Sequence, residues 1–328
     1  MGGVAPWVDL PLPAIPPSSW PRWIWPRPAA TAPCRPSPRP SGGSCGKPRW
    51  RETVTSLPAV DIPLLAEVLQ RFLAEELRAS GLSGYVCGLS GGLDSAVAAA
   101  LAVRAVGPEK LRLLALPGPT SSPESLAHAQ EAANTLGVRL ELVDLSAPSR
   151  LLAQTLGCED DRLRFGNLLA RLRMVALFDA ARAHGLLVLG TSNKSEILLG
   201  YSTLFGDQAA SVHPLGDVWK THVFALGEYL GVPAVILQKP PTADLWPGQT
   251  DAGELGFDYL EADPILYYHH DQGLSEAELC AQGFPPELVA KVLATYRRNR
   301  FKWRPTVIAR VSASCINVDR ILPRNPRP

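Results

Sequence analysis

The segment Gly88-Leu89-Ser90-Gly91-Gly92-Leu93-Asp94-Ser95 has the composition of a loop that binds phosphate groups. It follows a short apolar run and precedes an alanine-rich stretch, which predicts a position between a strand and a helix. Glycines let the backbone approach a ligand, N–H groups at a helix start face negative oxygens, and serine hydroxyls add donors. The segment lacks the residues that a Walker A loop or a GxGxxG turn requires. It therefore predicts a different anion site, suited to pyrophosphate.

The elements that position this loop follow from the spacing of apolar residues. A first helix is expected to begin at Asp61 and to end at Gly81. Short apolar runs then alternate with helical stretches, which predicts an α/β fold with a doubly wound parallel sheet and helices on both faces. The expected strands are 84–89, 111–116, 138–143 and 186–190, and the helices between them are 93–106, 123–136 and 162–184.

Sheets of this kind bind ligands beyond the carboxyl ends of their strands. We therefore expect the loops at 88–95, 116–122 and 190–196 to line one crevice. The periodicity weakens from Gly200 to about residue 218. Beyond it, helices are expected at 220–230, near 258–270 and at 285–300, with a loop through 239–256.

Residues 1–56 differ in composition from the rest of the chain, because they hold 13 of the 32 prolines and five of the eight tryptophans. No helix or interior strand tolerates that density of proline. We expect a disordered extension at 1–56 and one globular domain at 57–328; a proline-rich docking tail is the alternative.

Composition excludes several classes of function. A net charge of +1 argues against a nucleic-acid partner, since such proteins neutralise many phosphates. No apolar run is long enough to span a membrane, and the N-terminus lacks the pattern of a signal peptide.

The six cysteines form no CxxC pair, which predicts reduced thiols and no zinc site. His269 and His270 point about 100° apart on a helix, so a solvated helix end is expected instead of a metal site. A cytoplasmic protein with small-molecule substrates is the expectation.

The SGGxDS string, between a strand and a helix, resembles the PP-loop of the N-type ATP pyrophosphatases. These enzymes cleave ATP between the α- and β-phosphates to adenylate a carbonyl or carboxylate. The segment Gly190-Thr191-Ser192-Asn193-Lys194-Ser195-Glu196, continued by Gly200-Tyr201 and Gly206-Asp207, resembles the ammonia-dependent NAD synthetases specifically. The likeness extends in order from about residue 61 to at least residue 305. It includes Asn167 with Ala170–Arg173, His213–Gly216 followed by Lys220, and Lys239–Leu245.

The resemblance implies an ATP-pyrophosphatase domain at 57–328 that amidates deamido-NAD. The nicotinate carboxylate would attack the α-phosphorus of ATP, and ammonia would displace AMP from the acyl adenylate. NAD, AMP and pyrophosphate would be the products. It also implies Mg²⁺ as cofactor and a homodimer with the dinucleotide site near the subunit interface. Ammonia would be free or delivered by a separate subunit, because 56 proline-rich residues cannot form a glutaminase domain.

Individual roles are implied in the same way. Asp94 and Glu196 match the magnesium carboxylates, which agrees with the preference of a hard cation for carboxylate and phosphate oxygens. Asp94 and Lys220 match the catalytic residues, and Lys220 is expected to neutralise charge as pyrophosphate leaves. Arg171 and Lys302 match contacts to deamido-NAD. The expected ATP contacts are Gly88, Leu89, Ser90, Gly91, Gly92, Leu93, Asp94, Ser95, Thr191, Lys220 and Thr242.

The type of each of these residues also has an explanation that involves neither catalysis nor binding. Asp94 suits the dipole at a helix N-terminus, and Glu196 by itself would be a solvated helix residue. Arg171 and Lys302 would be surface cations, the latter among several arginines.

Two positions depart from many members of the family, which have Lys where Leu204 stands and Asp where Ser211 stands. The deamido-NAD contacts of those residues are therefore not expected here. The stretch from Gly200 to Ser211, with glycines at both ends of its part that contains Tyr and Phe, is expected to be a lid that excludes water.

Two other functions remain open at this point. A PP-loop ligase that modifies tRNA or forms GMP would share the loop, although the paired cysteines and basic surface typical of tRNA thiolation are not visible. A nucleotide-binding module without catalytic activity would retain the fold but would not release pyrophosphate.

Overall fold

The computed structural model describes residues 56–242, 244–246, 248–303, 306, 308, 309 and 311. Apart from Ser56, the expected N-terminal extension lies outside these residues, so its state stays a prediction. Among the residues described, no helix is long and apolar enough to cross a membrane.

Four parallel strands form the central sheet, in the order β3-β2-β1-β4. They are β1 (Gly84–Gly88), β2 (Leu111–Ala115), β3 (Leu140–Leu142) and β4 (Leu186–Leu189). From β1, the strands β2 and β3 are added on one side and β4 on the other. A topological switch point therefore lies between β1 and β4. The PP-loop follows β1 and the Gly190–Glu196 segment follows β4, which places both at that point.

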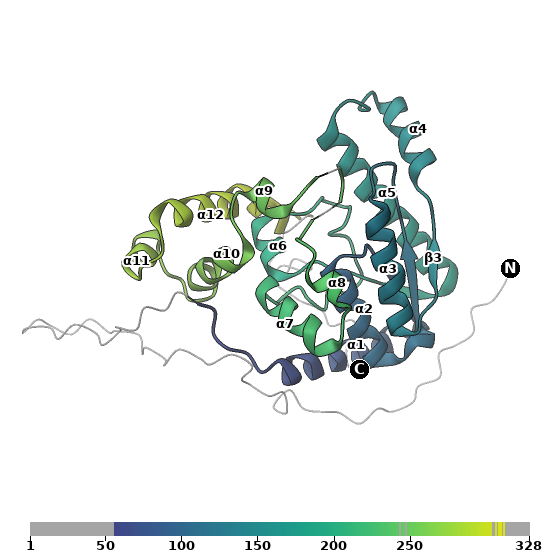
Figure 1. Ribbon diagram of the computed structural model, residues 1–328, viewed down its shortest axis with the longest axis horizontal. Coiled ribbons are helices and arrows are strands. Elements are labelled where there is room, and N and C mark those ends of the chain that lie inside the picture. The colour runs from purple at the N-terminus through teal and green to yellow at the C-terminus, as the bar shows by residue number, and fades with distance from the viewer. Residues whose placement is uncertain are drawn as a thin grey trace, which may run out of the picture. The chain divides into compact units, whose positions relative to one another are not determined.

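Helices cover both faces of the sheet, as the sequence predicts (Figure 1). Tyr85 and Cys87 of β1 pack into the core on one face, whereas Val86 packs into the core on the other face. The first face is covered by α1 (Ile62–Ser80), α2 (Leu93–Val106), α3 (Pro123–Leu136) and α7 (Lys220–Leu230), and the second by α5 (Arg162–His184). Because β1 and β4 are largely buried on both faces, they consist of small and apolar residues, whereas β2 contains Arg112 and the edge strand β3 contains Glu141.

The predicted first helix is confirmed at both ends. The Asp61 side chain caps α1 by accepting a hydrogen bond from the Leu64 N–H, and Gly81 ends the helix with a left-handed φ of 68°. Such a φ is readily adopted by glycine and costs other residues steric strain.

The sequence missed several short helices. Inside the expected loop 239–256 lies α9 (Asp251–Leu255), so a wholly irregular loop was wrong there. Helices of four to six residues span too few turns to produce a recognisable apolar period. The other unpredicted helices of this kind are α6 (Lys194–Leu199), α8 (Ala234–Leu237) and α11 (Glu276–Ala281). The sequence also missed α4 (Ser146–Leu156), whose 11 residues are long enough to show a period.

The C-terminal part consists of α10 (Tyr259–Leu266), a π-helical turn η3 (Tyr267–Asp271), α11, α12 (Pro286–Asn299) and a 3-10 turn η4 (Arg300–Trp303). In Figure 1, α10, α11 and α12 lie together on the opposite side of the ribbon from α3, α4 and α5. The π turn contains His269 and His270, whose Nδ1 atoms pair with the Leu274 carbonyl and the Tyr296 hydroxyl. Within the described residues, no three His, Cys, Asp or Glu side chains form a metal cluster.

Candidate active site

The PP-loop connects β1 to α2 and folds around its own serines. The Ser95 hydroxyl accepts a hydrogen bond from the Ser90 N–H at 3.2 Å and lies 3.1 Å from the Ser90 hydroxyl. Helix α2 begins after Gly92, a residue with no side chain to cap the N–H groups of the first turn. Such uncapped N–H groups at a helix start suit a phosphate oxygen.

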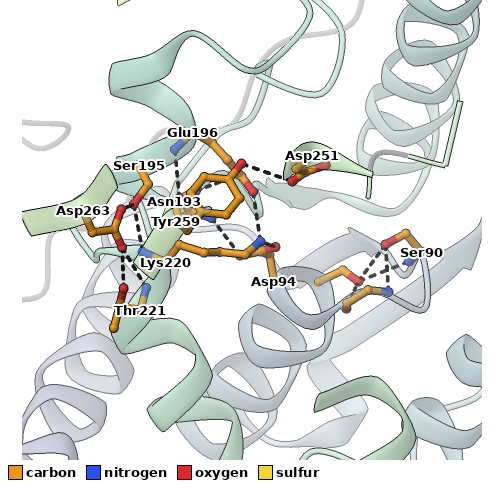
Figure 2. A network of polar contacts seen from close by, with 12 residues as sticks. Ser90, Asp94, Asn193, Ser195, Glu196, Lys220, Thr221, Asp251, Tyr259 and Asp263 are labelled. Atoms are coloured by element: carbon orange, nitrogen blue, oxygen red, sulfur yellow. Dashed lines mark hydrogen bonds and ion pairs between the residues drawn. The ribbon is translucent and has the colours of Figure 1, made fainter. Parts of the chain in front are cut away.

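Lys220, at the start of α7, joins the two acidic residues that the sequence singled out (Figure 2). Its Nζ lies 2.5 Å from Asp94 Oδ2 and 3.1 Å from Glu196 Oε1. The lysine side chain is only 3% exposed, so little water screens these pairs. The fold thus assembles an ammonium and two carboxylates from three separate segments at the start of α2.

The charges in this cluster shift one another's protonation. Burial raises the pKa of the Glu196 carboxyl, and the nearby Asp94 charge raises it further, to about 8 despite the opposing effect of Lys220. Burial acts to lower the pKa of Lys220, but the charges of Asp94 and Glu196 outweigh it and raise that pKa. Lys220 is therefore held as an ammonium that can stabilise negative oxygen.

Asn193 orients the carboxylates of Asp94 and Glu196 by hydrogen-bonding to the oxygen of each that does not pair with Lys220. Its Nδ2 donates to Asp94 Oδ1 at 2.9 Å, and its backbone N–H donates to Glu196 Oε2 at 3.3 Å. The Asn193 Oδ1 atom in turn caps α6 by accepting from the Glu196 N–H at 3.0 Å. Each carboxylate therefore has one oxygen tied to Asn193 and the other directed at Lys220.

This arrangement fits a magnesium ion. Asp94 Oδ2 and Glu196 Oε1 converge on a single point beside the anion loop, where the ammonium of Lys220 now lies. In the described part of the chain no third His, Cys, Asp or Glu side chain completes a metal-binding group with them. Mg²⁺ characteristically uses one or two carboxylates and completes its shell with phosphate and water oxygens, which matches this donor set.

Asp251 is a third acidic residue at the site, and sequence reasoning missed it. It is 4% exposed and accepts a hydrogen bond from the Tyr259 hydroxyl at 3.1 Å. Burial raises its pKa, while the charge of Lys220 lowers it. The sequence signals for its helix are the capping residues Thr250 and Gly256, because α9 is too short to show a period.

A cavity of about 510 Å³ extends from the PP-loop. Most of the predicted site residues line it, including Thr191, Glu196, Lys220, Thr242 and Lys302, together with Asp251. Gly91 and Arg171 do not line it. The PP-loop residues that line the cavity are Gly88, Leu89, Ser90, Gly92, Leu93, Asp94 and Ser95.

Gly91 instead packs against α3. Its φ is 76°, and a Cβ atom at this position would overlap the Ser125 carbonyl oxygen. The glycine is therefore needed to let the loop pass close to α3, without itself facing the cavity.

Arg171 lies on the exposed side of α5 and contacts the segment from Gly200 to Ser211. Its Nε donates to the Leu204 carbonyl oxygen at 3.2 Å, so the backbone of Leu204 takes part although its side chain departs from the family pattern. Ser211, the other departure, donates through its backbone N–H to the Val188 carbonyl at 2.8 Å and accepts from the Val188 N–H through Oγ.

The turn η4 holds the beginning of that segment. Lys302 Nζ donates to the Gly200 and Ser202 carbonyl oxygens, both at 2.7 Å. Trp303 Nε1 donates to the Leu198 carbonyl, and Asn299 Nδ2 donates to that of Leu199. The lysine predicted to reach the dinucleotide thus anchors the expected lid in this structure.

Comparisons with known proteins indicate one family for this chain. Residues 65–306 match the model of a family described as NAD synthase. The NH(3)-dependent NAD(+) synthetase of Chlorobaculum tepidum is 42% identical over 259 residues, which cover 79% of this chain and 93% of that protein.

Two solved structures that superpose on this chain are also named as synthetases. An NMN synthetase from Francisella tularensis superposes with a TM-score of 0.68 and 30% identity, covering 78% of this chain and all of that one. The NH3-dependent NAD synthetase from Campylobacter jejuni gives a TM-score of 0.64 at 28% identity, covering 77% of this chain and all of that one.

Proposed function

The chain belongs to the NAD synthase family, and from that premise we propose that it is a ligase that amidates deamido-NAD with ammonia and ATP, the final step of NAD formation. The observation that best supports this chemistry is the convergence of Lys220, Asp94 and Glu196 beside the PP-loop. An ammonium fixed at this place can stabilise the charge that develops on the departing pyrophosphate.

The reaction divides a difficult substitution into two easier ones. The nicotinate carboxylate attacks the α-phosphorus of ATP, and the bond to the β-phosphate oxygen breaks to release pyrophosphate. Ammonia then attacks the acyl carbon, AMP leaves, and the nitrogen loses a proton to give the carboxamide. The PP-loop residues and Thr191 and Thr242 would hold ATP, since they line the cavity around the cluster.

We infer that Asp94 and Glu196 bind Mg²⁺ in the loaded enzyme. The ion would neutralise phosphate charge and so favour the departure of pyrophosphate. The contribution of the chain is to hold two carboxylate oxygens at one point through Asn193. Lys220 is held against the same two oxygens, so its ammonium and the ion would both act on the charge of the same phosphate groups.

Arg171 and Lys302 are proposed to contact deamido-NAD. Both hydrogen-bond to the 200–204 backbone, next to the cavity that Lys302 itself lines. The peptide carbonyl of Leu204 and the Ser211 segment would replace contacts that side chains provide in other members of the family.

We also propose a homodimer that forms through α4 and α5. Apolar side chains remain exposed there, among them Leu151, Leu163 and Val175, which are 67%, 65% and 55% exposed. Exposed apolar groups of this kind commonly mark protein interfaces. Arg171 lies one turn before Val175 on α5, which would bring the dinucleotide close to the partner. Light scattering that gives a monomeric mass for a fully active sample would contradict this.

Ammonia is the proposed nitrogen source. The relative named as NH(3)-dependent is covered over 93% of its length. The extension at 1–56 is proposed to be dispensable, so a chain that begins at Leu57 should keep the activity and the melting temperature of the full chain.

One other compound is a candidate for the carboxylate substrate that ammonia amidates. Because the Francisella tularensis neighbour is named an NMN synthetase and because Leu204 and Ser211 depart from many family members, the deamido form of NMN is a second candidate substrate. Measured side by side, a higher kcat/KM with deamido-NAD supports the proposal, and a higher value with the mononucleotide favours the alternative.

The direct test is an assay with deamido-NAD, ATP, Mg²⁺ and ammonium that follows NAD, AMP and pyrophosphate together. Formation of all three in equal amounts supports the proposal, and repeating the assay with glutamine identifies the nitrogen source. Pyrophosphate without NAD would indicate another acceptor. The absence of all three products would favour a module that only binds nucleotide.

A further inference from the structure

Asp263 is a completely buried acidic residue that has no role in the chemistry described above. It lies in α10 and its carboxylate accepts three hydrogen bonds. Ser195 Oγ donates to Oδ1 at 2.5 Å, and both the backbone N–H and the hydroxyl of Thr221 donate to Oδ2, at 2.9 and 2.8 Å (Figure 2). All three partners are donors, which is the arrangement that an ionised, acceptor-only carboxylate requires.

The residues that hydrogen-bond to Asp263 are adjacent in the sequence to Glu196 and Lys220. Ser195 precedes Glu196 at the start of α6, and Thr221 follows Lys220 at the start of α7. Ser195 Oγ, while donating to Asp263, also accepts the Lys220 N–H at 2.9 Å. One chain of hydrogen bonds therefore joins α10 to the two helix starts that present Glu196 and Lys220.

Helix α7 depends on this chain of bonds because it lacks a cap of its own. Its N-cap residue is Trp219, which makes no capping hydrogen bond. Unpaired N–H groups in the first turn of a buried helix are costly, and a side chain normally accepts one of them. Here the N–H groups of Lys220 and Thr221 are accepted by Ser195 and Asp263. A carboxylate at this end of the helix also interacts favourably with the helix dipole.

We propose that Asp263 is a positioning residue, which caps α7 from α10 and thereby fixes Lys220 against Asp94 and Glu196. This inference rests on the proposed function, in which Lys220 stabilises the departing pyrophosphate. Catalytic groups displaced by about 1 Å can lose on the order of a hundredfold in rate. A shift at the start of α7 would move Lys220 in this way, although Asp263, Ser195 and Thr221 do not themselves line the cavity.

The test compares Asp263→Asn with Asp258→Ala in the full chain. Asp258 caps the same helix, α10, by accepting from the Leu260 N–H at 2.9 Å, and its capping hydrogen bonds stay within that helix. Asp263→Asn is expected to lower kcat about tenfold while the KM values for ATP and deamido-NAD change less than twofold. Asp258→Ala is expected to lower the melting temperature while kcat stays within twofold.

The decisive measurement repeats Asp263→Asn in a Lys220→Ala background. If Asp263 acts through Lys220, the second substitution lowers kcat less than twofold, because the group that it positions is already absent. A full tenfold loss in that background would overturn the inference, as would a single Asp263→Asn variant with unchanged kcat. Should Asp263→Asn fail to fold, Ser195→Ala takes its place, since it removes the bonds to both Asp263 and the Lys220 N–H.

Failure of the proposed function is distinguishable from failure of this inference. A wild-type chain that forms no NAD would overturn both. An active wild type whose Asp263→Asn and Ser195→Ala variants retain kcat would overturn the positioning role alone.

Discussion

Asn193 Nδ2 donates a hydrogen bond to Asp94 Oδ1 at 2.9 Å, although 99 residues separate the two in the sequence. The same asparagine binds Glu196 through its backbone N–H. A single buried residue therefore sets the orientation of both proposed magnesium carboxylates. Partners of this kind behind a metal site change metal affinity or activity about 10- to 100-fold when they are replaced.

Replacing Asn193 by serine should lower kcat/KM about 10- to 100-fold and raise the Mg²⁺ concentration needed for half-maximal rate. Serine still caps α6 but is too short to donate to Asp94, so the variant should stay folded and lose about 1–3 kcal/mol of stability for the unmade buried hydrogen bond. The matched control is Asn134→Ala, which removes a hydrogen bond between exposed side chains of α3. Equal activity in both variants would show that Asn193 does not orient the carboxylates.

Lys220→Met should destabilise the metal-free protein by about 3–5 kcal/mol, because it leaves the Asp94 carboxylate without its buried cation, while Glu196, whose pKa Lys220 lowers, would be protonated at neutral pH. Added Mg²⁺ should raise the melting temperature of this variant more than that of the wild type, since the ion replaces the missing charge. Arg71→Met removes an exposed ion pair with Glu67 and serves as the control, with a change below about 1 kcal/mol. The same Mg²⁺ shift in all three proteins would argue against binding between Asp94 and Glu196.

Gly91→Ala should abolish activity and reduce stability, because its Cβ would overlap the Ser125 carbonyl at a φ of 76°. Gly137→Ala provides the control: its φ is 66°, but a Cβ there has no neighbour within 4 Å. It should cost only the backbone strain of about 1–2 kcal/mol and leave kcat unchanged. Chemical unfolding and the synthetase assay measure both effects, and similar results for the two alanines would contradict the packing argument.

Cys87 should resist alkylation in the folded protein. Burial in β1 raises the pKa of its thiol from 9 to about 12, so its thiolate is about a thousandfold rarer at pH 8 than in an unperturbed cysteine. Reactivity should therefore rise only at strongly alkaline pH. Cys280 is partly exposed and should react with iodoacetamide at pH 8. Peptide mass spectrometry before and after unfolding measures both sites; rapid native labelling of Cys87 would contradict its burial.

Lys302→Met should loosen the segment from Gly200 to Ser211, because two carbonyl oxygens lose their shared donor. Limited proteolysis should cut this segment faster in the variant, and the KM for deamido-NAD should rise. Lys291→Met, which removes a comparable bond to the Gly256 carbonyl, is the control. If ATP and deamido-NAD do not change the protection of residues 200–211 in the wild type, the lid hypothesis fails.

The local features of the fold were predictable from the sequence. The anion loop, the four strands and the first helix with its Asp61 cap and Gly81 end are encoded in runs of neighbouring residues, where apolar spacing and glycine conformations act directly. Short elements such as α9 were missed, because a helix of five residues is stabilised by its packing more than by its own periodicity. Asp251 was missed with it.

The sequence by itself determined the family and the parallel α/β sheet, and it singled out Asp94, Glu196 and Lys220 as candidate site residues, since each follows from local motifs in a fixed order. Only the tertiary structure decided how these residues meet. Lys220 lies between the two carboxylates, Asn193 orients them, Gly91 faces α3 instead of the cavity, and Asp263 caps a helix to which it does not belong. Contacts between residues this far apart depend on how helices and strands pack, and packing leaves no pattern in a single stretch of chain.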